Sequence, residues 1–288
     1  MNAERVGIIL PSGGCKCAFQ AGALQAIAEY IPASHICYLQ GVSGGILNAA
    51  KFISDDFQAR ALIQVWRKIE GLGAGKLFDL FTVLLNQIGK NTPNQHLEDL
   101  LGQINPSSIL KSHAQLDIVV RNTRTNKAEL FSSHNLPAFR HKECYLRKLI
   151  LASASIPGIM PGVYLGGHMY CDGFVLIPEA LHTIKDQLDI VLVIDPEHQT
   201  DPFTPDLRPP FIPSGSWKSL GGSHYIYLDN LEKSITMLRM IVGEKKVYVI
   251  KPTRTYPHLT PITFAHGEIT DIIEQGYALT TRLLRSLQ

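Results

Sequence analysis

A serine with the surroundings of a nucleophile lies near the N-terminus, in the stretch Gly41-Val42-Ser43-Gly44-Gly45. The apolar run before it, residues 36–39, predicts a strand, and residues 46–52 after it predict the start of a helix. A strand, G-x-S-x-G and a helix in this order are typical of a nucleophile elbow, whose tight turn lifts the serine hydroxyl above the strand ends. Gly41 and Gly45 fit because a Cβ atom at either position would collide with the strand or the helix. Taken alone, the pattern also fits an ordinary structural turn.

A second Gly-rich turn precedes the serine. Residues 6–10 predict a strand, Pro11-Ser12-Gly13-Gly14 a tight loop, and residues 18–30 a helix. The backbone N–H groups of such a loop, at the N-terminus of a helix, form a site for an anion. Beside a nucleophilic serine, this site would stabilise an oxyanion. The loop does not match G-x-G-x-x-G, and residues 71–76 are one residue short of a P-loop, so neither stretch indicates nucleotide binding.

The elements that must position these residues alternate along the chain. Further strands are expected over residues 116–120, 190–194 and 247–250, and further helices over residues 145–155, 178–187, 227–242 and 269–287. This alternation predicts an α/β fold with a largely parallel sheet covered on both faces. Residues 163–170 alternate around Gly-Gly and predict a hairpin that leads to Asp172. No repeat or linker divides the chain, so residues 1–288 are expected to form a single domain.

Composition narrows the classes of function. The 288 residues are 45% hydrophobic and 18% charged, which is typical of a globular chain with a large core. The net charge of +2 and the absence of basic runs give no reason to expect a nucleic-acid partner. Five scattered cysteines lack zinc-ligand spacing, and no EF-hand cluster indicates calcium, so neither a metal nor another cofactor is expected.

Three features bear on membranes. The N-terminus lacks the layout of a signal peptide, and no apolar run approaches the roughly 18–20 residues that span a bilayer, so the expected location is cytoplasmic, with at most peripheral membrane contact. Residues 77–88 predict an amphipathic helix that either faces the core or acts as a lid touching lipid. The proline-rich segment 196–213 fits a lid or a binding loop.

Three stretches together resemble the patatin-like phospholipase family. The first is Ser12-Gly13-Gly14-Cys15-Lys16, followed by Gly22 in the helix, and the second is the serine turn. The third runs Ala152-Ser153-Ala154-Ser155-Ile156-Pro157 and leads to Asp172-Gly173-Phe174. It is similar to the family's A-S-x-A-x-P segment before D-G-G or D-G-A. The order and spacing of the three match the family, and the combination is much more specific than any single stretch.

The resemblance implies a three-layer α/β/α fold and a Ser-Asp dyad that hydrolyses fatty acyl esters of phospholipids or other lipids. It assigns Ser43 as the nucleophile and Asp172 as its base. The oxyanion hole would be formed by the backbone N–H groups of Gly13, Gly14 and Cys15. The residues that support these motifs are Gly41, Gly45, Lys16 and Gly173.

Other interpretations are open at this point. In an α/β-hydrolase a histidine would complete a Ser-Asp-His triad, and the histidines after Asp172 are His182, His198, His224, His258 and His266. A catalytically silent lipid-binding protein is another alternative, because Cys17 stands where the family usually has glycine and Phe174 where it has a small residue. Asp172 itself also fits a turn residue that caps the hairpin. The identity of the lipid and the oligomeric state are not determined by the sequence.

Overall fold

The computed structural model describes residues 5–72, 102–137, 141–157, 160, 162–197, 230–256, 258–260 and 264–288. Within these ranges the strands are β1 (Val6–Leu10), β2 (Ile36–Gly41), β3 (Gln115–Asn122), β4 (Lys127–Ser132), β5 (Val163–Leu165), β6 (His168–Asp172), β7 (Ile190–Ile194) and β8 (Val247–Ile250). The α-helices are α1 (Ala18–Tyr30), α2 (Gly44–Ser54), α3 (Arg60–Leu72), α6 (Pro106–Lys111), α7 (Lys142–Ser153) and α9 (Glu268–Ser286), and a further helix covers residues 230–242.

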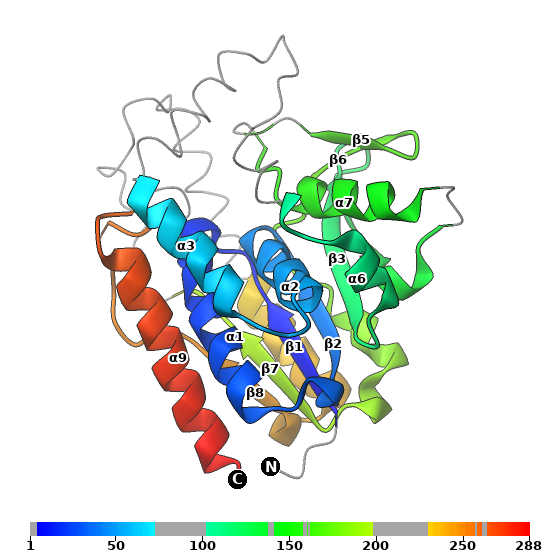
Figure 1. Ribbon diagram of the computed structural model, residues 1–288. Helices are drawn as coiled ribbons and strands as arrows, with labels where there is room; N and C mark the ends of the chain where they lie inside the picture. The colour runs from blue at the N-terminus through cyan, green and yellow to red at the C-terminus, as the bar shows by residue number, and fades with distance from the viewer. Residues whose placement is uncertain are drawn as a thin grey trace.

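The strands form one mixed sheet in the order β5-β6-β3-β2-β1-β7-β8, with β4 also paired to β3 (Figure 1). Strands β3, β2, β1, β7 and β8 are parallel to one another, whereas β4, β5 and β6 form antiparallel pairs. The parallel strands therefore all end at one edge of the sheet, which is where open α/β sheets bind their ligands. The largely parallel sheet expected from the sequence is confirmed.

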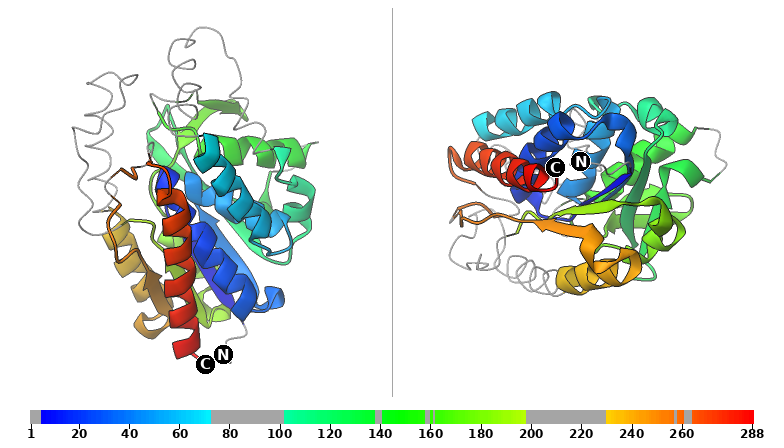
Figure 2. Two further views of the ribbon diagram at one scale, coloured as in Figure 1. Left: turned by 60° about the vertical axis from the view of Figure 1, so that its left-hand side comes forward. Right: turned by 90° about the horizontal axis from the view of Figure 1, so that it is seen from below.

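Side chains of the central strands alternate between the two faces of the sheet. In β7, residues 190, 192 and 194 belong to a core cluster with α1, α2 and α9, whereas Val191 and Val193 pack with the helix over residues 230–242. A strand covered on both faces needs an unbroken apolar run, because successive side chains point to opposite sides. Figures 1 and 2 show α1, α2, α3 and α9 over one face and the helix 230–242 over the other. The arrangement is a three-layer α/β/α sandwich.

Helices α1 and α9 cross at a pair of glycines. A Cβ atom on Gly22 would collide with the carbonyl oxygen of Ile273, and one on Gly276 with the carbonyl oxygen of Phe19. The two backbones thus approach more closely than side chains at these positions would allow. The interpretation of Gly22 as a point of close backbone contact is confirmed. The C-terminal helix, which carries no motif, is tied by this crossing to the helix that follows the Gly-rich loop.

The prediction of a helix over residues 178–187 is wrong. Residues 178–187 form two short 3₁₀ segments, Pro178–Thr183 and Lys185–Gln187. Pro178 and Leu181 are the buried residues of the first segment, and the second has none. With so few apolar side chains to bury, the stretch lacks the amphipathic face that stabilises most helices of proteins.

Two expected features lie outside the described residues: the amphipathic helix at 77–88 and the greater part of the proline-rich segment, from residue 198 onward. Among the helices that the structure describes, none combines the length and the apolar character needed to cross a bilayer.

Candidate active site

Ser43 occupies the tight turn between β2 and α2. Its backbone φ of 59° and ψ of −130° lie outside the regions that non-glycine residues ordinarily adopt. A Cβ atom on Gly41 would lie 2.7 Å from the Cα of Ile46 in α2, and one on Gly45 would collide with the carbonyl oxygen of Leu10 at the end of β1. Both glycines are therefore required sterically, and the turn has the strained geometry of a nucleophile elbow.

Pairing along β3 brings Asp172 to this turn. Ile118 of β3 pairs with Gly41 of β2 on one edge, and Val120 pairs with Asp172 of β6. At both positions β4 occupies the other edge of β3. Strands β2 and β6 therefore lie on the same edge and meet end to end. The carboxyl ends of these two strands are separated by two residues of β3, or about 7 Å, and the turn that carries Ser43 closes this gap.

The Asp172 carboxyl is fully buried. The Phe174 N–H donates a hydrogen bond of 2.9 Å to Oδ1. Among the described residues, Oδ2 has no hydrogen-bond partner of ordinary geometry, so it is available to accept a proton. Burial raises the pKa of Asp172 from its usual 3.8 to about 7, and the Ser43 hydroxyl is the first of the groups that act against this rise.

The segment after α7 links the serine to the aspartate. The Ser43 N–H donates to the Ser153 carbonyl oxygen at 3.1 Å, and the Asp172 N–H donates to the Ser155 carbonyl oxygen at 2.9 Å. The Ser153 hydroxyl in turn donates to the Val119 carbonyl oxygen at 2.7 Å. These two serines belong to the A-S-x-A-x-P stretch, to which the sequence assigned no individual role. The structure gives them one, because they fix the backbone on both sides of the site.

The Gly-rich loop lies directly beside the elbow. A Cβ atom on Gly44 would lie 3.0 Å from the Gly14 carbonyl oxygen and 2.8 Å from Sγ of Cys17. Gly14 itself has a φ of 55°, a conformation that favours glycine. The N–H groups of Gly13, Gly14 and Cys15 donate no hydrogen bond to any described residue, and they lie at the start of the 3₁₀ turn that leads into α1. Such free N–H groups next to a serine are suited to stabilise an oxyanion.

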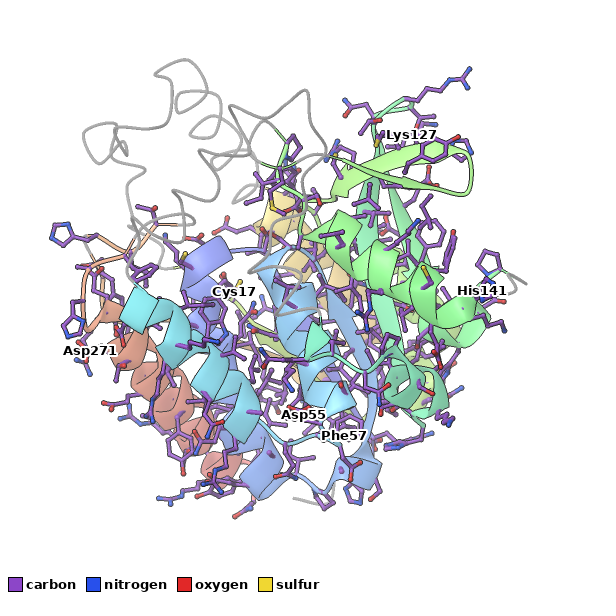
Figure 3. The ribbon with its side chains drawn as sticks, turned by 45° about the horizontal axis from the view of Figure 1, so that its top comes forward. Cys17, Asp55, Phe57, Lys127, His141 and Asp271 are labelled. Carbon is purple, nitrogen blue, oxygen red and sulfur yellow. The ribbon has the colours of Figure 1, made fainter. Side chains whose placement is uncertain are left out.

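Cys17, where the family usually has glycine, is accommodated in this arrangement. Its side chain is fully buried at the start of α1, beside α2 (Figure 3). Burial is the largest cause that raises the pKa of its thiol well above the usual value, which keeps the thiol protonated and unreactive. Phe174 has a φ of 58°, so a second residue of the site is in a strained conformation.

Residues after β7 hold the Gly-rich loop from the other side, and sequence reasoning missed them. Nζ of Lys16 lies 2.6 Å from Oε2 of Glu197, and the two side chains are only 5% and 2% exposed. Cγ of Pro196 would lie 2.5 Å from a Cβ atom on Gly13. Asp195 accepts a hydrogen bond from the Glu197 N–H at 3.0 Å. We call residues 195–197 the brace, because they contact the loop through both its backbone and its lysine.

Nothing in the described part of the chain indicates a histidine partner for Ser43 and Asp172 or a metal ligand set. His182, His258 and His266 are exposed, and no histidine is among the groups that shift the pKa of Asp172. His198 and His224 lie outside the described residues. In the described ranges, no three side chains of His, Cys, Asp or Glu gather into a metal-binding group.

The mostly parallel three-layer sandwich and its strained serine turn define a class of α/β proteins with a nucleophile-elbow geometry. A profile of the patatin-like phospholipase family matches residues 8–181, more than half of the chain. The chain therefore belongs to the patatin-like phospholipase family, a family of lipid acyl hydrolases. A search of curated proteins found no significant match.

Several solved structures are similar to the chain at low sequence identity, and the first of them shares its fold. VipD from Legionella pneumophila has a TM-score of 0.51 and 14% identity, covering 98% of this chain and 67% of its own. Human GIVD cytosolic phospholipase A2, in complex with methyl gamma-linolenyl fluorophosphonate, has a TM-score of 0.46 and 12% identity, with 98% and 58% covered. ExoU in its complex with SpcU from Pseudomonas aeruginosa has a TM-score of 0.43 and 13% identity, with 98% and 52% covered. The chain thus spans between half and two thirds of these structures.

Proposed function

We propose that the chain is a serine acyl hydrolase that cleaves fatty acyl esters of phospholipids or related lipids through a Ser43–Asp172 dyad. The observation that carries this proposal is the strained Ser43 next to a fully buried carboxyl whose Oδ2 is free of other described partners. Membership of the patatin-like phospholipase family supports a lipid as the substrate. The exposed positions of His182, His258 and His266 favour a dyad over a triad.

The proposed reaction has two steps that share one pair of residues. Asp172 accepts the proton of the Ser43 hydroxyl as Oγ bonds to the ester carbonyl carbon. The negative carbonyl oxygen is stabilised by N–H groups of Gly13, Gly14 and Cys15 and by the N-terminus of α2. The bond to the leaving alcohol then breaks, and Asp172 returns the proton to that oxygen. Water then attacks the acyl-enzyme in the same way. Asp172 accepts a proton from the water and returns it to Oγ of Ser43 as the fatty acid is released.

A fluorophosphonate probe and a panel of acyl lipids test the proposal. We expect the probe to label the wild-type chain at Ser43 and the wild type to release fatty acid, whereas Ser43→Ala should lose both activities because it lacks the nucleophile. Ser286→Ala is a matched control, since it removes an exposed serine hydroxyl at the end of α9, outside the proposed site. Labelling at a residue other than Ser43, or full hydrolysis by Ser43→Ala, would contradict the proposed mechanism.

The buried Asp172 predicts a pH dependence. A base must be ionised to accept a proton, and burial raises the pKa of Asp172 to about 7. We therefore expect kcat/KM for a soluble ester to be low in acid and to rise with an inflection near pH 7. Burial raises the pKa of Asp195 to about 7 as well, so the control is Asp195→Asn. An inflection that disappears in Asp195→Asn would assign the titration to the brace and not to the dyad.

A further inference from the structure

Two exposed apolar side chains face each other on the β5–β6 hairpin. Among the described residues, the large hydrophobic side chains that are exposed are Tyr164 at 64%, Met169 at 41% and Met240 at 81%. Tyr164 and Met169 are directly paired across the hairpin, so their side chains lie on the same face. Single exposed apolar residues are ordinary, but a paired tyrosine and methionine form a small continuous patch.

The other face of this hairpin is already covered. Leu165 and Tyr170 are buried in the main core cluster, and the ring of Phe131 packs edge-on against Tyr170. A hairpin that covers a core with one face normally carries polar residues on the other. Tyr164 and Met169 lie where the alternation predicts polar side chains, so the outer face of the hairpin is apolar without contributing to the core.

Cations flank this patch. Both the N–H and the hydroxyl of Thr123 donate to the Met169 carbonyl oxygen, at 2.9 and 3.1 Å, and this ties the β3–β4 turn to the hairpin. Arg124 and Lys127 of that turn are exposed, and neither forms an ion pair with a described residue. Figure 3 shows Lys127 at the end of the molecule that carries the hairpin.

Exposed negative charge is absent from the described part of these two hairpins, residues 115–132 and 162–172. Glu129 is half-buried and accepts a hydrogen bond of 3.0 Å from the Tyr170 hydroxyl, and Asp172 is buried. The patch therefore combines an amphipathic aromatic side chain, a flexible apolar side chain and unpaired cations. These are the groups by which peripheral proteins bind the interface of an anionic bilayer.

We propose that this face, defined by Tyr164, Met169, Arg124 and Lys127, docks the chain onto anionic lipid bilayers. The patch is continuous with the proposed active site, because β6 runs from Met169 to Asp172 in three residues, or about 10 Å. The hairpin also extends past the end of β3, at the edge of the sheet that carries Ser43. Docking there presents the site to lipid. The docking inference rests on the proposed hydrolase function, but vesicle binding is measured without catalysis.

The test is vesicle sedimentation of the full chain in a Ser43→Ala background. Vesicles contain phosphatidylcholine alone or with about one third phosphatidylserine. We expect binding to the mixed vesicles to weaken roughly tenfold in Tyr164→Ser/Met169→Ser, because apolar area no longer enters the interface. Each cation near an anionic surface contributes about fivefold, so Arg124→Gln/Lys127→Gln should lose about 25-fold and most of the preference for phosphatidylserine.

Matched controls carry the same changes elsewhere. Met240→Ser removes the third exposed hydrophobic residue, and Lys245→Gln removes a lysine at the opposite end of the sheet, so both should bind vesicles as the background does. Equal binding by the hairpin variants and the background, equal loss in the controls, or no vesicle binding at all would each overturn the docking surface. A different outcome would reject the proposed function alone. In that case vesicle binding depends on the hairpin, but the chain with Ser43 intact hydrolyses no ester.

Discussion

Replacement of Asp172 by asparagine is expected to lower kcat by between about 10² and 10⁴, which is the range that general bases contribute. Asparagine keeps the shape of the side chain, and its Oδ1 still accepts from the Phe174 N–H. It cannot take the serine proton. Because the change removes only the proton acceptor, KM for a soluble ester should change much less than kcat. The measurement is steady-state hydrolysis of such an ester by the wild type and the variant.

The stability of Asp172→Asn separates a catalytic loss from misfolding. The pKa of Asp172 is about 7 in the folded chain and near 3.8 when unfolded, so between these values the folded chain binds more protons and stability falls as pH rises. Above pH 7 the ionised carboxyl therefore destabilises the fold, and asparagine does not. The free energy of unfolding of the variant at about pH 8 should equal or exceed that of the wild type.

Two histidine variants test the alternative of a Ser-Asp-His triad. His258→Ala and His266→Ala change exposed side chains and should retain kcat. A loss in either variant as large as that in Asp172→Asn would mean that a histidine completes the site and that the dyad is wrong. Such a result would also require the segment around residues 258–266 to reach Ser43 when substrate binds.

Most of the sheet could be predicted from the sequence because its strands are buried on both faces. The expected strands 6–10, 190–194 and 247–250 match β1, β7 and β8, and the expected helix 18–30 matches α1. An unbroken apolar run between turn residues has few other structures available. The prediction of a helix over residues 178–187 is wrong because the apolar periodicity there is weak. Two short 3₁₀ segments bury the same apolar side chains.

The serine turn and the Gly-rich loop can be predicted from the sequence because each carries a steric requirement. Gly41 and Gly45 are glycines because the elbow leaves no space for a Cβ atom, and Gly14 has a positive φ. The backbone roles of Ser153 and Ser155 were not accessible, since a carbonyl oxygen has no sequence signature. Glu197 was missed for a different reason. It lies 181 positions from Lys16, and only the pairing of β1 with β7 shows that the loops after these strands meet.

Breaking the buried ion pair between Lys16 and Glu197 is expected to be the most destabilising single change of a charged group near the site. Removing one member of a buried pair leaves the other charge without its partner in a medium of low dielectric. We therefore expect Lys16→Met and Glu197→Gln each to lower the free energy of unfolding by about 3–5 kcal/mol. Urea denaturation followed by circular dichroism measures this. Both variants should also lose kcat, because the brace then no longer fixes the backbone N–H groups of Gly13 and Gly14.

Two comparisons show whether the pair acts as a unit. The double variant Lys16→Met/Glu197→Gln should lose clearly less stability than the sum of the single changes, because neither side chain of the buried pair then carries a charge. Glu244→Gln makes the same change in a pair whose glutamate is 74% exposed, at 3.4 Å from Arg239, and should cost less than about 1 kcal/mol. Single variants no less stable than Glu244→Gln would show that the Gly-rich loop keeps its structure without the brace. The proposed oxyanion hole would then depend on Gly14 and the start of α1 alone.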